Sequence, residues 1–230
     1  FQAEDGIRDF CLSRGLGDVY KRQDGTLWLN IGDSYYNYRP GKGQALSKQT
    51  VSNTRQDLPD KCARRGNKLK GLKEKDLIGI PWMLAFALRA DGWYLRQDII
   101  WNKPNPMPES VRDRCTKSHE YIFLLSKSQN YYFDVDAIKE PTRRKRSVWT
   151  VNNKPYRGAH FAVFPPDLIE PCIRAGSREG DIVLDPFMGS GTTAMVAKSL
   201  KRYYMGCELH EEYGDLMEER VPLDVVAISS

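Results

Sequence analysis

An acidic residue directly before a glycine-rich turn is the feature of this sequence that most clearly could do chemistry. The stretch Val183-Leu-Asp-Pro-Phe-Met-Gly-Ser-Gly-Thr-Thr193 runs from apolar residues through Asp185 to Gly189 and Gly191. Glycines let the backbone turn tightly and approach a ligand closely, and threonine hydroxyls can cap a following helix. The pattern predicts a strand that ends at Asp185 and presents a small ligand to the start of a helix.

A second acidic residue, Glu208, ends the next apolar segment at roughly the 20-residue spacing typical of an acid that binds a ribose diol. The turn from Gly189 to Ala194 also satisfies the relaxed G-x-G-x-x-A fingerprint, so a nicotinamide dinucleotide stays an alternative ligand. However, the Asp185 carboxylate would lie near the pyrophosphate, and an acid there suits a ligand with amino groups or positive charge. S-adenosylmethionine carries a sulfonium, an ammonium and a ribose without phosphate, so the pattern favours it.

The elements that would position these residues alternate between strands and helices in the last third of the chain. Strands are expected at 181–185 and 203–209, and helices at 192–202 and 211–221. This order predicts a parallel sheet with right-handed crossovers.

Upstream, the apolar pattern predicts three strands and one helix around irregular segments. The helix is expected at 76–91, with Asp76 as its N-cap and Gly92 as its stop. Three prolines in five residues exclude regular structure directly after the second strand. The three strands are expected at 26–31, 93–103 and 120–128.

The composition allows a sizeable core and a nucleic-acid partner. The 230 residues are 40% hydrophobic, and the net charge is +5, which permits a nucleic-acid partner without requiring one. Five scattered cysteines without a Cys-x-x-Cys pair indicate reduced thiols in a cytoplasm rather than a disulfide framework or a zinc site. No apolar run approaches the 18 residues of a membrane span.

The segments VLDPFMGSGTT and GCELHEEY together resemble motifs of the DNA amino-methyltransferases, which methylate the exocyclic nitrogen of cytosine (N4) or adenine (N6). HFAVFPPDLIEPCI (160–173) resembles the segment that closes the methionine end of the cofactor pocket in the permuted group of this family. DGTLWLNIGDSY, the stretch from DLIGIPWM to ESVRDR, and SHEYIFLLSKS resemble its middle motifs in the expected order, so the resemblance covers about 24–220.

The resemblance implies a Rossmann-like three-layer α/β methyltransferase fold with an inserted recognition region, S-adenosyl-L-methionine as cofactor and double-stranded DNA as partner. The middle motifs favour cytosine over adenine, and a cognate restriction enzyme is a further expected partner. An NAD(P)-dependent oxidoreductase and a non-catalytic DNA-binding module remain the alternatives. Carried over by position, the residues that would line the cofactor pocket are Phe161, Pro165, Asp185, Phe187, Gly189, Ser190, Gly191, Thr192, Thr193 and Glu208.

The catalytic motif of the family does not occur in this sequence. These enzymes flip the target base out of the duplex and hold its amino group with an Asp/Asn/Ser-Pro-Pro-aromatic motif. The only Pro-Pro pair is Pro165-Pro166, which lacks the preceding polar residue and the following aromatic residue. We therefore assign no catalytic residue, and expect an incomplete, inactive enzyme.

Residues 1–23 resemble a translated sequencing-adaptor sequence, and we expect them to be a foreign or disordered leader in place of the catalytic segment. In the permuted group, the strand that bears the catalytic motif lies between the strands equivalent to 26–31 and 181–185. The sheet should therefore be interrupted there, or those two strands should be forced together.

Positive charge gathers in two segments. Residues 39–75 hold eleven Lys and Arg against three acids, which predicts an inserted loop, and 139–146 reads KEPTRRKR. Such segments would follow DNA phosphates, although solvated polar loops are the alternative. The candidate DNA contacts are Arg64, Arg65, Lys68, Lys70, Lys103, Arg112, Arg114, Lys117, Arg143, Arg144, Lys145 and Arg146.

These features divide the chain into a leader, a methyltransferase domain and a tail. The expected bounds are 1–23, 24–220 and 221–230, with a basic insertion (39–75), a basic linker (139–158) and a cofactor-binding half (159–213) inside the domain.

Overall fold

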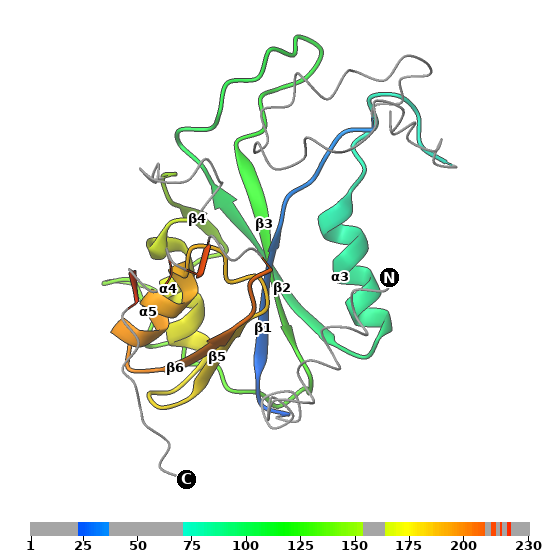
Figure 1. Ribbon diagram of the computed structural model, residues 1–230. Helices are drawn as coiled ribbons and strands as arrows, with labels where there is room; N and C mark the ends of the chain where they lie inside the picture. Colours follow the sequence, from blue (N-terminus) through cyan, green and yellow to red (C-terminus); the bar gives the residue numbers. More distant parts are fainter. Residues whose placement is uncertain are drawn as a thin grey trace.

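The computed structural model describes residues 23–36, 71–153 and 164–209, and the single residues Tyr213, Gly214, Met217, Arg220 and Val221. Its described strands form two sheets, which Figure 1 shows as separate ribbons. The larger sheet has the order β1-β3-β2-β4 and contains β1 (Thr26–Ile31), β2 (Tyr94–Asn102), β3 (His119–Ser126) and β4 (Val148–Thr150). The smaller sheet is β5 (Ile182–Asp185) with β6 (Tyr203–Gly206), and the helices are α3 (Ile80–Ala90), α4 (Pro166–Gly176) and α5 (Thr192–Ser199).

The larger sheet lies between helices, because side chains of its central strand alternate between two faces. On β3, Phe123 and Leu125 are fully buried and pack with Ala85 of α3 on one face. Ile122 points to the other face, where it joins a cluster with Leu168 of α4. Figure 1 shows α3 and α4 on opposite sides of this sheet, which confirms the three-layer α/β architecture predicted from the sequence.

Most predicted elements are present with shifted ends. The strand at 26–31 has the predicted bounds, and β5 and β6 pair in parallel as expected. Strand β4 was not predicted, because its three residues follow a basic run and show no period of their own. In the predicted helix at 211–221, the described residues Tyr213, Gly214, Met217 and Arg220 are helical. None of the described helices combines the length and the apolar character needed to cross a membrane.

The predicted N-cap of α3 is wrong, since a distant carboxylate performs this role. The helix begins at Ile80, after Gly79 in a left-handed conformation with φ 81°. Asp33 Oδ1, from the segment after β1, accepts hydrogen bonds from the backbone N–H groups of Gly79 at 3.0 Å and Ile80 at 3.1 Å. Asp76 instead accepts a hydrogen bond from Lys73 N at 2.7 Å within a local turn. The start of α3 is therefore tied to the end of β1.

Two short segments, 34–36 and 75–78, pair at the place where the basic insertion leaves and rejoins the fold, and we call them the insertion neck. Tyr36 N donates to Asp76 O at 2.8 Å, Lys75 N donates to Tyr36 O at 2.8 Å, and Ile78 N donates to Ser34 O at 2.9 Å. Residues 37–70, which make up most of the predicted insertion, lie outside the described residues. The described segments before and after residues 37–70 therefore lie side by side.

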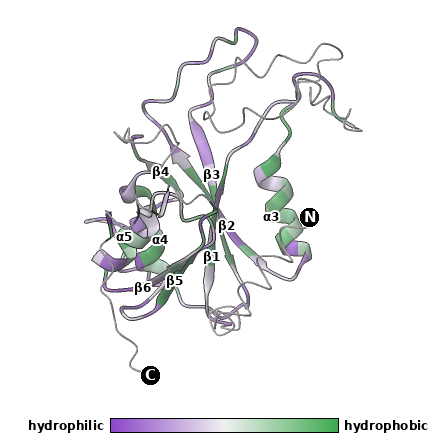
Figure 2. Cartoon of the chain, viewed as in Figure 1, coloured by the Kyte–Doolittle hydropathy of each residue, from purple (hydrophilic) through white to green (hydrophobic). Residues whose placement is uncertain are grey.

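The expected interruption of the sheet is confirmed within the described residues. No described ladder joins β1 to β5, although the parallel strand β5 is apolar at Ile182, Val183 and Leu184, as its green colour in Figure 2 illustrates. Strands of parallel sheets are normally covered on both faces, yet Ile182 and Leu184 are 43% and 37% exposed. Only the face of Val183 is packed, in a cluster with Val196 of α5.

Replacement of Asp33 tests the remote cap. We expect Asp33→Ala to lower the free energy of unfolding by about 2 kcal/mol, because the N-terminal amides of α3 lose a buried acceptor. Asp91→Ala, at the other end of the same helix, is the control and should change stability by less than about 0.5 kcal/mol. Urea unfolding measures both variants, and equal losses would refute the capping role.

Candidate functional site

Asp185 lies at the carboxyl end of β5 and holds the glycine turn from both sides. Its Oδ1 accepts a hydrogen bond from Phe187 N at 2.9 Å, and its Oδ2 accepts one from the Thr193 hydroxyl at 2.5 Å. The first contact fixes the start of the turn, and the second fixes the first turn of α5. The carboxylate predicted from the sequence is thus the anchor of the loop that it precedes.

The glycines of this turn are required by close approach as well as by conformation. Gly191 precedes α5 with φ 77°, and a Cβ there would lie 2.7 Å from Met217 Cγ. Gly206 at the end of β6 is equally constrained, since a Cβ would lie 2.8 Å from Asp185 O. The helix containing Met217 and the strand β6 therefore pack directly against the turn.

Glu208 reaches the same turn from the neighbouring strand. Its Oε2 accepts a hydrogen bond from Gly189 N at 2.7 Å, and its Oε1 accepts one from Leu209 N at 2.9 Å. A carboxylate has about four acceptor positions, so these bonds are compatible with a ligand diol. The structure brings Asp185 and Glu208 together on one loop, as their spacing predicted.

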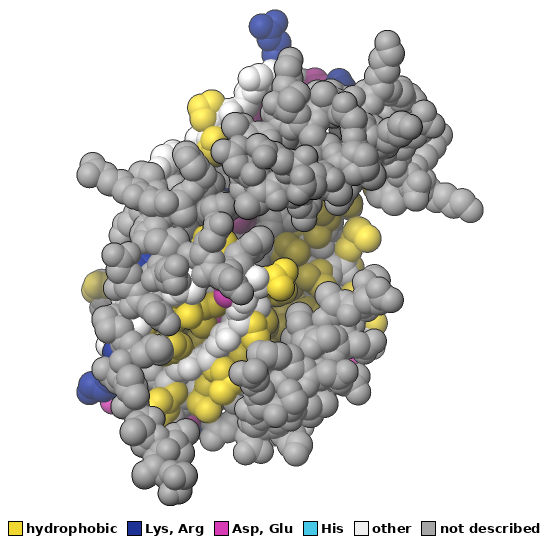
Figure 3. Space-filling view, in the orientation of Figure 1, with side chains coloured by type: hydrophobic (Ala, Val, Ile, Leu, Met, Phe, Trp, Pro, Cys, Tyr) yellow, Lys and Arg dark blue, Asp and Glu magenta, His cyan; other side chains and the backbone are white. Residues whose placement is uncertain are grey.

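Two large apolar side chains flank this pair of acids in solvent. Phe187 is 77% exposed and Leu209 is 91% exposed. Figure 3 shows hydrophobic side chains gathered on the visible face of the molecule. Leu209 was not among the predicted site residues, although it directly follows Glu208, the predicted ribose acid. An exposed phenylalanine and leucine beside these two carboxylates would suit the flat apolar ring of an adenine.

The hydroxyl residues of the turn are buried, and so is Pro165. Ser190, Thr192 and Thr193 are all less than a tenth exposed. Pro165 occupies the N-cap position of α4 and is fully buried, with its carbonyl accepting a hydrogen bond from Leu168 N at 3.0 Å. The remaining cofactor candidate, Phe161, lies outside the described residues.

Arg220 is a functional candidate that sequence reasoning missed. Its Nη1 donates to Ser190 O at 2.9 Å, to Ser190 Oγ at 2.8 Å and to Thr192 Oγ1 at 3.4 Å. The available signal was the helical spacing of Tyr213, Met217 and Arg220, which places them on one face. The guanidinium thus binds Ser190 in the same turn in which the two acids bind the amides of Phe187 and Gly189.

The predicted DNA contacts near the segment 103–118, between β2 and β3, mostly have partners inside the protein. Lys103 pairs with Glu120, Arg114 lies 2.5 Å from Glu109, and Lys117 lies 3.9 Å from Asp33. The hydrogen bond from Arg114 holds the pKa of Glu109 below its ordinary value. By contrast, Arg112 is exposed and has no partner among the described residues.

The second basic run precedes β4, which pairs in parallel with the last three residues of β2. Arg143 pairs with Glu140 at 2.6 Å, and Lys145 Nζ lies 5.0 Å from the Trp149 ring centroid. Arg144 and Arg146 are exposed. The candidates in the insertion, Arg64, Arg65, Lys68 and Lys70, lie outside the described residues.

Comparison with known proteins points to one family. The family described as DNA methylase matches residues 18–219. The chain is 50% identical over 237 residues to the type II methyltransferase M.SmaI of Serratia marcescens, covering 95% of this chain and 76% of that protein. It covers 65% of the length of each of two further type II methyltransferases.

Solved structures give a consistent result. The structure of an M1.HpyAVI–SAM complex is 29% identical, with a TM-score of 0.51 over 62% of this chain and 70% of that one. The cytosine-N4-specific PvuII DNA methyltransferase is 18% identical, with a TM-score of 0.66 over 99% of this chain and 74% of that one, and it supports the fold alone. These matches agree with the α/β methyltransferase fold and give no support to an oxidoreductase or a non-catalytic DNA-binding module.

Arg220→Met tests the clamp on the glycine turn. We expect the affinity for S-adenosylmethionine to fall about tenfold, since charged hydrogen bonds contribute roughly 1.5–3 kcal/mol. Arg220→Lys should recover part of this loss. Arg202→Met is the matched control, because Arg202 bonds to the carbonyls of Ser177 and Leu200 instead. Titration calorimetry on all three variants measures the effect, and unchanged affinity in Arg220→Met would exclude the clamp.

Proposed function

The chain belongs to the DNA methylase family, and from this membership we propose that it binds S-adenosylmethionine, the cofactor of the family, at the turn between β5 and α5. Glu208 receives the ribose hydroxyls. Phe187 and Leu209 supply apolar surface for the adenine ring. Asp185 and Arg220 hold the turn in the shape that the methionine end of the cofactor requires.

The observation that carries this assignment is the use of the amide groups of the turn. Phe187 N donates to Asp185, Gly189 N donates to Glu208, and Gly191 N donates to Met188 O. A pyrophosphate needs such amides as donors, whereas here two of them already serve carboxylates. The loop therefore disfavours a dinucleotide and favours a ligand without phosphate.

The reaction of the family is methyl transfer to the exocyclic amino group of cytosine or adenine in DNA, and the middle motifs favour cytosine. Such transfer requires a flipped base held in a pocket beside the methyl donor. We propose the same reaction on double-stranded DNA for the protein to which this sequence belongs; because residues 1–230 hold no polar-Pro-Pro-aromatic motif, we expect transfer only when a segment that carries this motif is supplied. The type II relatives support a cognate restriction enzyme as a further partner, and the free cysteines among the described residues support a cytoplasmic location.

Calorimetry separates this proposal from its oxidoreductase alternative. We expect the chain to bind S-adenosylmethionine and S-adenosylhomocysteine and to show no heat with NAD. Glu208→Gln should weaken cofactor binding, because a neutral amide has fewer acceptor positions for the ribose. Glu179→Gln, an exposed residue paired with Lys201, is the control and should bind as the unaltered chain does. Binding of NAD in preference to the methyl donor would overturn the assignment.

A methylation assay tests whether the chain transfers a methyl group to DNA. The chain should transfer no radioactive methyl group from S-adenosylmethionine to DNA, although it binds the cofactor. A chimera in which residues 1–23 are replaced by a segment that carries a polar-Pro-Pro-aromatic motif, as the resemblance to the family implies, should transfer it. Methyl transfer by the unaltered chain would show that another residue holds the base.

A further inference from the structure

The segment 103–118, which we call the proline loop, presents an apolar tip to solvent. Met107 is 81% exposed and Val111 is 42% exposed. Met107 lies between Pro106 and Pro108, and each proline fixes its own φ and restricts the preceding residue. The tip is therefore a stiff apolar projection. None of its residues belongs to the proposed cofactor site.

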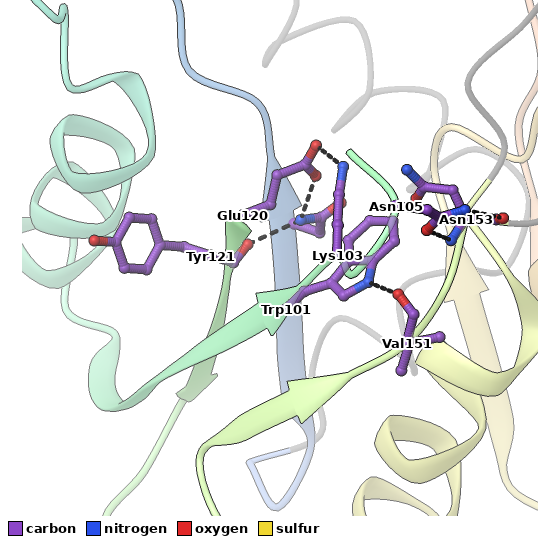
Figure 4. A network of polar contacts seen from close by, with 8 residues as sticks. Trp101, Lys103, Asn105, Glu120, Tyr121, Val151 and Asn153 are labelled. Atoms are coloured by element: carbon purple, nitrogen blue, oxygen red, sulfur yellow. Dashed lines mark hydrogen bonds and ion pairs between the residues drawn. The ribbon is translucent and has the colours of Figure 1, made fainter. Parts of the chain in front are cut away.

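The start of the proline loop is clamped to the sheet, as Figure 4 shows. Asn105 Nδ2 donates to Asn153 O at 3.2 Å, and Asn153 N donates to Asn105 Oδ1 at 3.0 Å. This reciprocal pair joins the segment after β2 to the segment after β4. Close by, Lys103 pairs with Glu120 and lies 4.0 Å from the Trp101 ring centroid.

The returning half of the proline loop is fastened to the insertion neck. Lys75 Nζ lies 2.7 Å from Asp113 Oδ2, and the Arg114 guanidinium lies 3.9 Å from the Tyr35 ring centroid. The ion pair holds the pKa of Asp113 below its ordinary value. Figure 1 shows the proline loop and the neck at one end of the molecule, beyond the larger sheet. Both halves of the loop are thus held while its tip stays free.

We propose that Met107 is a wedge that enters the DNA duplex and unstacks a base step, with Arg112 on a neighbouring phosphate. The inference rests on the proposed function, which supplies a duplex whose base must leave the stack. DNA-bending proteins insert methionine, proline and similar side chains between base steps at a cost of a few kcal/mol. The clamped backbone lowers the ordering cost of that insertion.

The size of the tip decides between DNA and a protein partner. A stable protein interface buries on the order of 1,000 Å² or more, which a single methionine with its neighbouring prolines does not provide. A wedge needs only one side chain. The cations Lys103, Arg114 and Lys117 already have acidic partners, so the loop offers its partner an apolar tip and one exposed arginine.

Binding of the whole chain to DNA duplexes tests the wedge. Two duplexes of equal length are compared, one intact and one with a single abasic position, where unstacking costs less. The unaltered chain should bind the abasic duplex about tenfold more tightly. Met107→Ala should lose this preference and bind the intact duplex about tenfold more weakly, whereas Met107→Leu should keep both properties. Met83→Ala is the control, because Met83 is 63% exposed on α3.

Salt dependence separates the wedge from a phosphate contact. Met107→Ala should leave the slope of log affinity against log salt unchanged, while Arg112→Ala should reduce it by about 1. If Met107→Ala prefers the abasic duplex over the intact one as strongly as the unaltered chain does, the wedge is refuted. It is also refuted if Met107→Ala changes only the self-association of the chain and not its affinity for DNA. An absence of DNA binding by the unaltered chain would also overturn it. Cofactor calorimetry needs no DNA, so its result decides the proposed function separately.

Discussion

The arrangement of the cofactor loop depends on carboxylates that accept hydrogen bonds from backbone amides. Asp185 and Glu208 come from two parallel strands, and each binds an amide of the turn between β5 and α5. The turn is therefore shaped by side chains before a ligand arrives. The same bonds remove the donors that a phosphate would use, so one interaction sets both the conformation of the loop and the ligand class that it disfavours.

The same type of contact joins the described segments on either side of residues 37–70, where the sequence predicts a basic insertion. Asp33 caps α3 across 46 residues of sequence, and its side chain is only 4% exposed. Together with the hydrogen bonds of the insertion neck, this cap holds Tyr36 and Lys75 next to each other after the carboxyl end of β1. The closure entropy of a loop rises only slowly with its length, so a basic segment of this size is tolerated once its ends are fixed. The proline loop is joined to the neck by the ion pair of Asp113 with Lys75 and by the contact of Arg114 with the Tyr35 ring.

Local features of the fold could be read from the sequence, whereas contacts between distant segments could not. The apolar run of β3 and the glycines before α5 are local patterns, so these elements and the approach of Asp185 and Glu208 to one turn were predictable. The cap was assigned to Asp76 because local rules favour the acid nearest to the helix, and Asp33 was closer only in space. Arg220 was missed because its acceptors in Ser190 lie 30 residues away in sequence; the helical spacing of Tyr213, Met217 and Arg220 indicates a shared face but not what that face contacts.

Helix α4 packs against both of the described sheets. Leu168 and Cys172 pack against the larger sheet, whereas Ile173 packs with Val196 of α5 on the cofactor side. Burial raises the pKa of the Cys172 thiol far above its ordinary value, as expected for a group enclosed by apolar side chains. Because no described backbone ladder joins β1 to β5, the relative position of the cofactor turn and the larger sheet depends on this side-chain packing.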